Sequence, residues 1–265
     1  MSKLEQALQK ADAQRGGNAK VQGNEPAVQG SSAIENKESG KGIQIAEPNL
    51  RTAKEMDKLR IVCAQSLNAA LLNEFRELRT SVLSRVSSRN VVIMVTGIAP
   101  NSGASFVAMN LAASIALNEN RTSIIVECDL MAPSFSHLLP KDYQNGLTEY
   151  LQADDLTLQS VIYPIGVERV RLIPAGKARH AMEYFTSEKL RQLLSEIQNR
   201  YTERTVIIDA PSVVSSADAR ILTSICDYAL LVVPYGEANE EVVAEAARAI
   251  GKEKFLGVVF NRVPE

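Results

Sequence analysis

A glycine-containing turn between a buried strand and a helix is the segment of this chain best suited to chemistry. After the apolar run at 91–96, residues 97–103 read GIAPNSG, and a helix-forming stretch begins at Ala104. The first turn of a helix carries unpaired backbone N–H groups and the positive end of the helix dipole, which together attract an anion such as phosphate. Gly103 allows a ligand to approach the backbone closely, and the Ser105 hydroxyl can reach a Mg²⁺ ion. The segment therefore predicts a phosphate site.

The same turn departs from the phosphate-binding pattern G-x-x-x-x-G-K-[ST] at two positions. Gly103 and Ser105 match it, but Ile98 replaces the first glycine and Ala104 replaces the lysine. That lysine places a positive charge on the β- and γ-phosphates, where charge develops during phosphoryl transfer. Since one charge-assisted hydrogen bond is worth about 1.5–3 kcal/mol, we expect nucleotide affinity to fall about tenfold to a hundredfold. Phosphoryl transfer should suffer more than binding.

Carboxylates follow two other apolar runs. Asp129 comes after 123–128, and Asp209 ends the run at 205–209. Either could hold a Mg²⁺ ion or its water shell, and Asp129 could instead activate a hydroxyl. A single aspartate at a strand end is often only a cap or turn residue, and that alternative stays open for each. Asp218 is expected to cap or support the helix that follows it.

Apolar runs alternate with helical patterns along the chain from about residue 60. Because the runs are apolar throughout and are joined by helices, they indicate a parallel sheet covered on both faces, with ligands bound beyond the carboxyl ends of its strands. The predicted fold class is a P-loop NTPase-like three-layer α/β/α domain with a mostly parallel central sheet. The predicted strands are 91–96, 123–128, 170–174, 205–209, 228–234 and 255–260, and the predicted helices are 67–86, 104–118, 186–200, 216–225 and 239–250.

Length and composition limit the class of protein. With 265 residues, 45% of them hydrophobic, the chain has enough for one large core but not for two large domains. A net charge of −2 argues against a nucleic-acid partner. Residues 1–48 are expected to be a flexible segment with a short amphipathic helix at 3–13, and residues 49–265 the α/β domain.

The chain is expected to be cytoplasmic. Its N-terminus lacks the apolar stretch of a signal peptide, and no apolar run approaches the roughly 18 residues of a membrane span. Cys63, Cys128 and Cys226 fit no disulfide or zinc spacing and are expected to be buried apolar residues in a reducing compartment. His137 and His180 are expected to be surface residues.

Seven segments, taken in order, resemble the cytoplasmic kinase domain of the bacterial tyrosine kinases of capsule and exopolysaccharide synthesis. That family belongs to the deviant-Walker P-loop ATPases, together with partitioning and division-site proteins. The resemblance covers roughly residues 70–262, and it depends on the order and spacing of the segments together. They are FRELRT (75–80), PNSGAS (100–105), ECDLMAP (127–133), GLTEYL (146–151), LIPAG (172–176), VIIDAP (206–211) and the pair Asp218-Ala219.

Members of this family bind ATP with Mg²⁺, work beside a membrane-embedded polysaccharide co-polymerase (a chain-length regulator), and phosphorylate tyrosines on neighbouring subunits of a ring. The resemblance implies that Asp129 and Asp209 are catalytic and that they bind Mg²⁺ together with Ser105. It implies homo-oligomer contacts through Arg76 and Arg79. The nucleotide contacts that it implies come from Asn101, Ser102, Gly103, Ala104, Ser105 and Phe106.

The departures from the family pattern are as informative as the matches. Ala104 replaces the essential lysine, and Asn101 replaces a glycine, although asparagine tolerates positive φ better than most residues. The last tyrosine is Tyr235, so no phosphoacceptor tail is expected. The other replacements are Glu127 for an aspartate, Met131 and Ala132 for a basic pair, and Asn73 for an interface glutamate.

Three functional hypotheses remain open. The first is a pseudo-kinase: a regulator or adaptor of exopolysaccharide (capsule) biosynthesis and export that binds ATP or ADP with Mg²⁺ weakly or not at all. It would lie at the inner membrane through a co-polymerase partner. The second is an active tyrosine autokinase or ATPase in which a loop lysine, Lys141 or Lys177, replaces the missing one, although solvated loop lysines are the simpler interpretation. The third is a ParA/MinD-like positioning ATPase, which would need an intact nucleotide switch.

Overall fold

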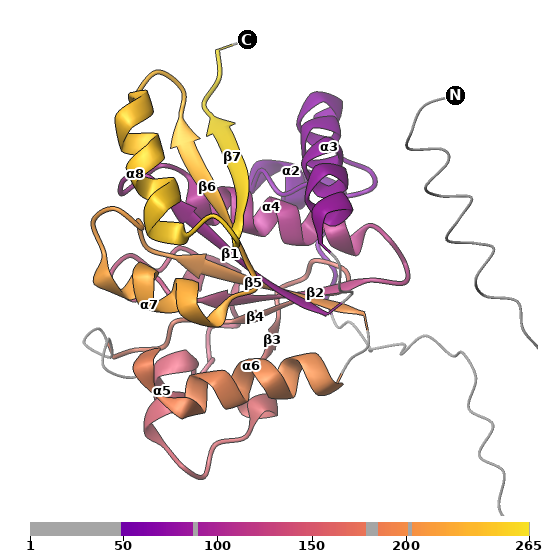
Figure 1. The fold of residues 1–265 in the computed structure, drawn as a ribbon. Coiled ribbons are helices and arrows are strands. Elements are labelled where there is room, and N and C mark those ends of the chain that lie inside the picture. The colour runs from indigo at the N-terminus through magenta and orange to yellow at the C-terminus, as the bar shows by residue number, and fades with distance from the viewer. Residues whose placement is uncertain (1–48, 87–89, 179–184, 201–202, 265) are drawn as a thin grey trace, which may run out of the picture. The chain divides into compact units, whose positions relative to one another are not determined.

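The computed structural model describes residues 49–86, 90–178, 185–200 and 203–264. Seven strands form one sheet in the order β3-β4-β2-β5-β1-β6-β7 (Figure 1). Only the β3–β4 pair is antiparallel among the described strands, which confirms the predicted α/β fold with a mostly parallel sheet. The strands are β1 (Val91–Gly97), β2 (Thr122–Glu127), β3 (Tyr163–Pro164), β4 (Val170–Ile173), β5 (Arg204–Ala210), β6 (Tyr228–Pro234) and β7 (Phe255–Asn261).

Helices cover both faces of this sheet. The α2, α3 and α4 helices pack on one face, and α5 to α8 contribute to the core on the other. Their bounds are α2 (Ala53–Lys58), α3 (Ala69–Arg85), α4 (Ala104–Ala116), α5 (Leu147–Gln152), α6 (Glu188–Arg200), α7 (Ala217–Ile225) and α8 (Glu240–Ile250), with short 3₁₀ turns η1 (Ser136–Leu138) and η2 (Leu158–Val161).

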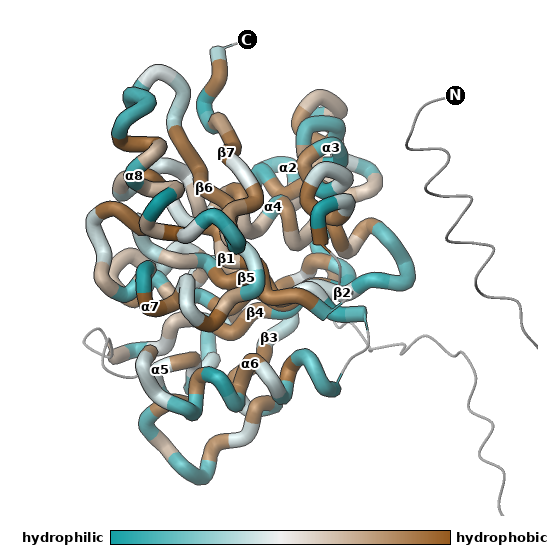
Figure 2. The backbone as a smooth tube through the Cα atoms, in the orientation of Figure 1, coloured by the Kyte–Doolittle hydropathy of each residue, from teal (hydrophilic) through white to brown (hydrophobic). Residues whose placement is uncertain are grey.

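The apolar residues of the strands alternate between two cores. In β1, Val92 and Met94 pack in the core beneath α5 to α8, whereas Val91, Ile93 and Val95 pack in the core beneath α2 to α4. All seven residues of this strand are buried, which explains why its sequence shows no polar alternation. In Figure 2 the central strands are hydrophobic along most of their length, while the helices show both hydrophobic and hydrophilic stretches.

The predicted elements agree with the structure to within two residues at each end, and five short elements were missed. These are α2, α5, the two-residue strand β3 and the 3₁₀ turns η1 and η2. Each is too short to show a periodicity, and α5 depends on a tertiary contact: Leu147 N donates to Pro174 O at 2.7 Å. The 3–13 helix and the linker at 14–48 lie outside the described residues, as does His180.

One prediction for a side chain was wrong, and one open alternative is decided by the structure. Cys63 is partly exposed, whereas Cys128 and Cys226 are buried as expected. Ser216, not Asp218, is the N-cap of α7, since the Ser216 hydroxyl accepts the Asp218 N–H at 3.2 Å. Asp218 instead lies in the first helical turn, where its negative charge suits the positive end of the helix dipole. No helix in the described ranges combines the length and apolarity needed to cross a bilayer.

Candidate nucleotide site

The turn between β1 and α4, residues 98–103, has a fixed internal structure and is called the loop below. Asn101 and Gly103 adopt positive φ angles of 63° and 88°. Within the loop, Ala99 N donates to the Ser102 hydroxyl at 3.0 Å and Ser102 N donates to Ala99 O at 3.3 Å. Ser102 is 2% exposed, so its side chain closes the turn and is not available to a ligand. The loop is therefore shaped by its own hydrogen bonds.

The first turn of α4 offers its backbone to an anion. Gly103 is the N-cap and supplies no side-chain cap. Val107 N donates to Gly103 O at 3.0 Å, but among the described residues the N–H groups of Ala104, Ser105 and Phe106 make no hydrogen bond. Such groups at a helix start need water or a ligand as partner. The first turn of α4 thus has the unbonded N–H groups on which the prediction of a phosphate site depends, and it has Ala104 in place of the lysine.

Asp209, at the carboxyl end of β5, is a buried carboxylate. It is 1% exposed, and neither oxygen accepts a hydrogen bond among the described residues. Burial raises its pKa well above the usual range, and Glu127 and Asp129 add to this rise. The Ser105 hydroxyl lies close enough to oppose part of it, although it makes no hydrogen bond of normal length and angle with either oxygen. A partnerless buried carboxylate beside a hydroxyl suits a hard divalent cation such as Mg²⁺.

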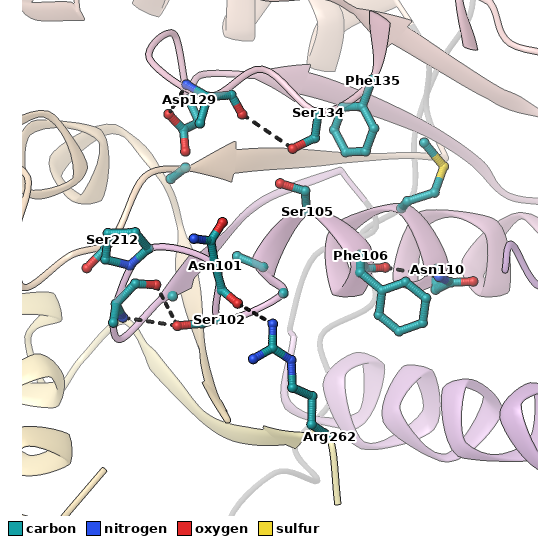
Figure 3. A pocket seen from close by; sticks show the side chains of 18 of the residues that line it. Asn101, Ser102, Ser105, Phe106, Asn110, Asp129, Ser134, Phe135, Ser212 and Arg262 are labelled. Carbon is teal, nitrogen blue, oxygen red and sulfur yellow. Dashed lines mark hydrogen bonds between the residues drawn. The ribbon is translucent and has the colours of Figure 1, made fainter. Parts of the chain in front are cut away.

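Asp129 lies on the opposite wall of the site from the loop. Its Oδ1 accepts the Ala132 N–H at 3.1 Å, which is the turn role left open by the sequence. Its side chain also lines the cavity in front of α4, and it is only partly buried (Figure 3). Asp129 therefore combines a turn-forming bond with a carboxylate that faces the site.

Glu127 has a structural role that the sequence did not suggest. Its buried carboxylate accepts the N–H groups of Ser134 at 2.5 Å, Phe135 at 2.9 Å and Ala175 at 3.0 Å. Burial raises its pKa, and these three hydrogen bonds oppose the rise. The side chain thus joins the segment after β2 to the end of β4. No sequence pattern signalled this, because two of the donors lie seven and eight residues away and the third, Ala175, follows the end of another strand.

A cavity of about 430 Å³ lies between the loop, α4 and the segment from Asp129 to Leu138. Polar groups of the loop and of the first turn of α4 line it. Apolar residues line it as well: Leu59, Ile61, Phe106, Met109, Phe135 and Leu138. The volume lies in the range of small-molecule sites.

Two basic residues of the cavity were not predicted. His137 is exposed, as expected, but it also lines the cavity. Arg262 lines it from the end of β7, and among the described residues it is the only lining side chain with a permanent positive charge. Lys141 and Lys177, considered as replacements for the missing lysine, are exposed and do not line it. The loop therefore faces an arginine that is distant in sequence.

The two arginines assigned to subunit contacts lie on α3 and differ in environment. Arg79 donates from Nη1 to Ser114 O at 2.9 Å, and burial lowers its pKa. Arg76 is exposed. Arg79 thus holds α3 against α4 within the chain, whereas the Arg76 side chain remains accessible.

Curated sequence relatives of the chain are tyrosine-protein kinases and related transport proteins. Tyrosine-protein kinase wzc of Salmonella typhimurium is 30% identical over 196 residues, which is 72% of this chain and 27% of that protein. YwqD of Bacillus subtilis is 26% identical over 74% of this chain and 82% of its own length. The succinoglycan biosynthesis transport protein ExoP of Rhizobium meliloti is 24% identical over 66% of this chain and 22% of its length.

Solved structures with the same fold include kinase domains. The BceF tyrosine kinase domain aligns with a TM-score of 0.67 at 25% identity, over 82% of this chain and 91% of that domain. The kinase domain of Escherichia coli ETK gives 0.65 at 24%, over the same shares of the two chains. The cell division ATPase MinD of Pyrococcus furiosus gives 0.55 at 21%, over 65% of this chain and 72% of MinD, and shares the fold alone. No protein-family model matches the chain. The chain spans about a quarter of the length of the first curated relatives it matches.

Proposed function

Because this chain belongs to the family of bacterial tyrosine kinases, we propose that it is a regulator or adaptor of exopolysaccharide (capsule) biosynthesis and export that no longer relies on phosphoryl transfer. The observation that carries the proposal is Ala104 at the start of α4, where the loop pattern calls for lysine. Without that lysine, the loop lacks the positive charge that stabilises the negative charge developing on the phosphoryl group during transfer.

What is retained supports weak binding of ATP or ADP. The free N–H groups of Ala104, Ser105 and Phe106 would contact phosphate oxygens, with the backbone of Asn101, Ser102 and Gly103 shaping the loop around them. Ser105, Asp129 and Asp209 would hold Mg²⁺, and the partnerless carboxylate of Asp209 fits such an ion. When bound, the ion would neutralise charge on the phosphates. The chain itself would bind and orient the nucleotide.

The proposed partner is a membrane polysaccharide co-polymerase, through which the chain would be held at the inner membrane. The name of ExoP, a transport protein of succinoglycan biosynthesis, supports placement in polysaccharide synthesis. Homo-oligomer contacts would involve Arg76, whose side chain is exposed on α3, more directly than Arg79, which bonds within the chain.

Calorimetric titration with ATP and ADP, each with Mg²⁺, tests the proposal together with mass spectrometry for phosphotyrosine. We expect weak or undetectable binding by the natural chain and no autophosphorylation. Ala104→Lys should bind more tightly by about tenfold or more, since it restores one charge-assisted contact. Ala244→Lys is the matched control, because it adds the same charge on an exposed position of α8. Abundant phosphotyrosine on the natural chain would contradict the proposal.

An active autokinase or ATPase is the alternative that the retained residues favour. Ser105, Asp129 and Asp209 supply oxygen ligands for Mg²⁺, and Arg262 brings a positive charge to the cavity. Tight binding by the natural chain with turnover of ATP would select this alternative. A positioning ATPase of the ParA/MinD type would in addition dimerise on ATP, which light scattering with and without nucleotide would detect.

A further inference from the structure

The end of β7 reaches across to the loop and holds it at two points. The Asn261 amide donates from Nδ2 to Ser102 O at 3.0 Å. The next residue, Arg262, donates from Nη2 to Asn101 O at 2.7 Å (Figure 3). Two consecutive residues thus bind two consecutive loop carbonyls from a distance of about 160 positions along the chain.

The strand end is itself fixed in place. Asn261 pairs with Pro234 of β6, and Tyr235 N donates to Asn261 O at 2.8 Å. Arg262 has a φ of 59°, in the left-handed region that non-glycine residues rarely adopt. A residue keeps such a backbone only where its surroundings impose it, and these conformations gather at ligand-binding and switch segments.

The loop is shaped to receive the Asn261 amide. A Cβ on Gly103 would lie 2.1 Å from Asn261 Nδ2, so only glycine leaves room for this contact. Asn101, the acceptor for Arg262, has a left-handed backbone as well. Arg262 also approaches Glu237 at 3.4 Å, but that pair is more than half exposed on both sides and contributes little. The bond to the loop is therefore the more specific contact of this guanidinium.

We infer that Asn261 and Arg262 are positioning residues: by binding the Ser102 and Asn101 carbonyls, they keep the loop in a phosphate-receptive shape before any ligand binds. Pre-organisation of this kind lowers the cost of binding, because the loop need not be ordered by the ligand. This clamp from β7 adds two long-range contacts to the hydrogen bonds that the loop makes within itself. The inference rests on the proposed nucleotide site, but the loop's own order can be measured without nucleotide.

Hydrogen–deuterium exchange on the full chain without nucleotide tests the clamp. The reporters are the bonded amides of Ile98, Ala99 and Ser102. In Asn261→Ala and Arg262→Ala we expect these amides to exchange about threefold to tenfold faster, as the loss of one hydrogen bond implies. Arg262→Lys, which keeps a donor, should recover part of the protection.

Arg248→Ala is the matched control. Arg248 also donates to a backbone carbonyl, Ala244 O at 3.2 Å, but does so within α8 and away from the loop. The Arg248→Ala variant should leave hydrogen exchange in the loop unchanged. Amides of β1 and β5 report whether any of the variants has lost its fold. Unchanged loop exchange in folded Arg262→Ala and Asn261→Ala would overturn the inference. Because no nucleotide is present, this outcome is distinct from a failure of the proposed function, which calorimetry measures.

Discussion

Replacing Asp209 by asparagine should stabilise the chain when Mg²⁺ is absent. The Asp209 carboxylate is 1% exposed and has no hydrogen-bonding partner among the described residues, so its ionised form is poorly solvated in the folded state. An uncompensated buried charge destabilises a protein by about 3 kcal/mol or more. The asparagine amide is uncharged but still leaves polar atoms unpaired, at a cost of about 1–3 kcal/mol. The expected net gain is about 1–2 kcal/mol, or a rise in Tm of about 2–8 °C.

The pH dependence of this gain follows from the direction of the pKa shift. Burial raises the Asp209 pKa in the folded state above the 3.8 of an ordinary aspartate. Between the ordinary and the raised pKa, the folded state binds more protons than the unfolded state, so Asp209 lowers the stability of the natural chain as pH rises. The advantage of Asp209→Asn should therefore vanish near pH 4, grow with pH, and become constant above the raised pKa.

Thermal unfolding followed by circular dichroism between pH 4 and pH 8 measures this gain. Asp227→Asn is the matched control: Asp227 is exposed and accepts the Val92 N–H at 2.8 Å, which asparagine can also do. Millimolar Mg²⁺ should raise the Tm of the natural chain more than that of Asp209→Asn, because the substitution removes one of the two carboxylate charges proposed to hold the ion. A variant that is less stable than the natural chain at pH 8 without Mg²⁺, or a gain that does not change with pH, would refute the reasoning.

Three further substitutions test other parts of the site. Gly103→Ala should destabilise the chain by about 1–3 kcal/mol in urea unfolding, because its φ is positive and its Cβ would meet the Asn261 amide. Glu127→Ala should cost about 3 kcal/mol or more in the same assay, since it leaves three buried N–H groups without an acceptor; a loss below 1 kcal/mol would show that water replaces the carboxylate. Arg79→Ala should lose about 1 kcal/mol of stability, whereas Arg76→Ala should leave Tm unchanged and weaken any self-association seen by sedimentation.

The sequence predicted those residues of the site whose positions follow from the order of strands and helices along the chain. The order strand, loop, helix placed Gly103 and Ser105 at a helix start, and the fold rule for parallel sheets placed Asp129 and Asp209 at the same edge. The structure brings these residues together, since Gly103, Ser105 and Asp129 line one cavity and the Asp129 carboxylate adds to the rise of the Asp209 pKa. It also separates them by role, since Asp129 lines the cavity while Asp209 is buried at the end of β5.

Residues that act through long-range contacts were missed. Arg262 and Asn261 follow an apolar strand, and nothing in their types or spacing links them to residues 101 and 102. Their place at the loop depends on the strand order β1-β6-β7 and on the register of β7 against β6. Glu127 was noticed only as a departure from a family pattern, although its carboxylate joins two segments of the cavity wall.

The sequence by itself determined the fold class, the position of the loop and the absence of its lysine, because apolar runs, helix starts and residue types are local properties of the chain. The tertiary structure alone decided which charges face the loop, which carboxylate is left without a partner, and which strand end holds the loop in shape. Those properties depend on how the strands are ordered in the sheet and on how completely water is excluded between the packed elements. The spacing of residues along the chain determines neither of them.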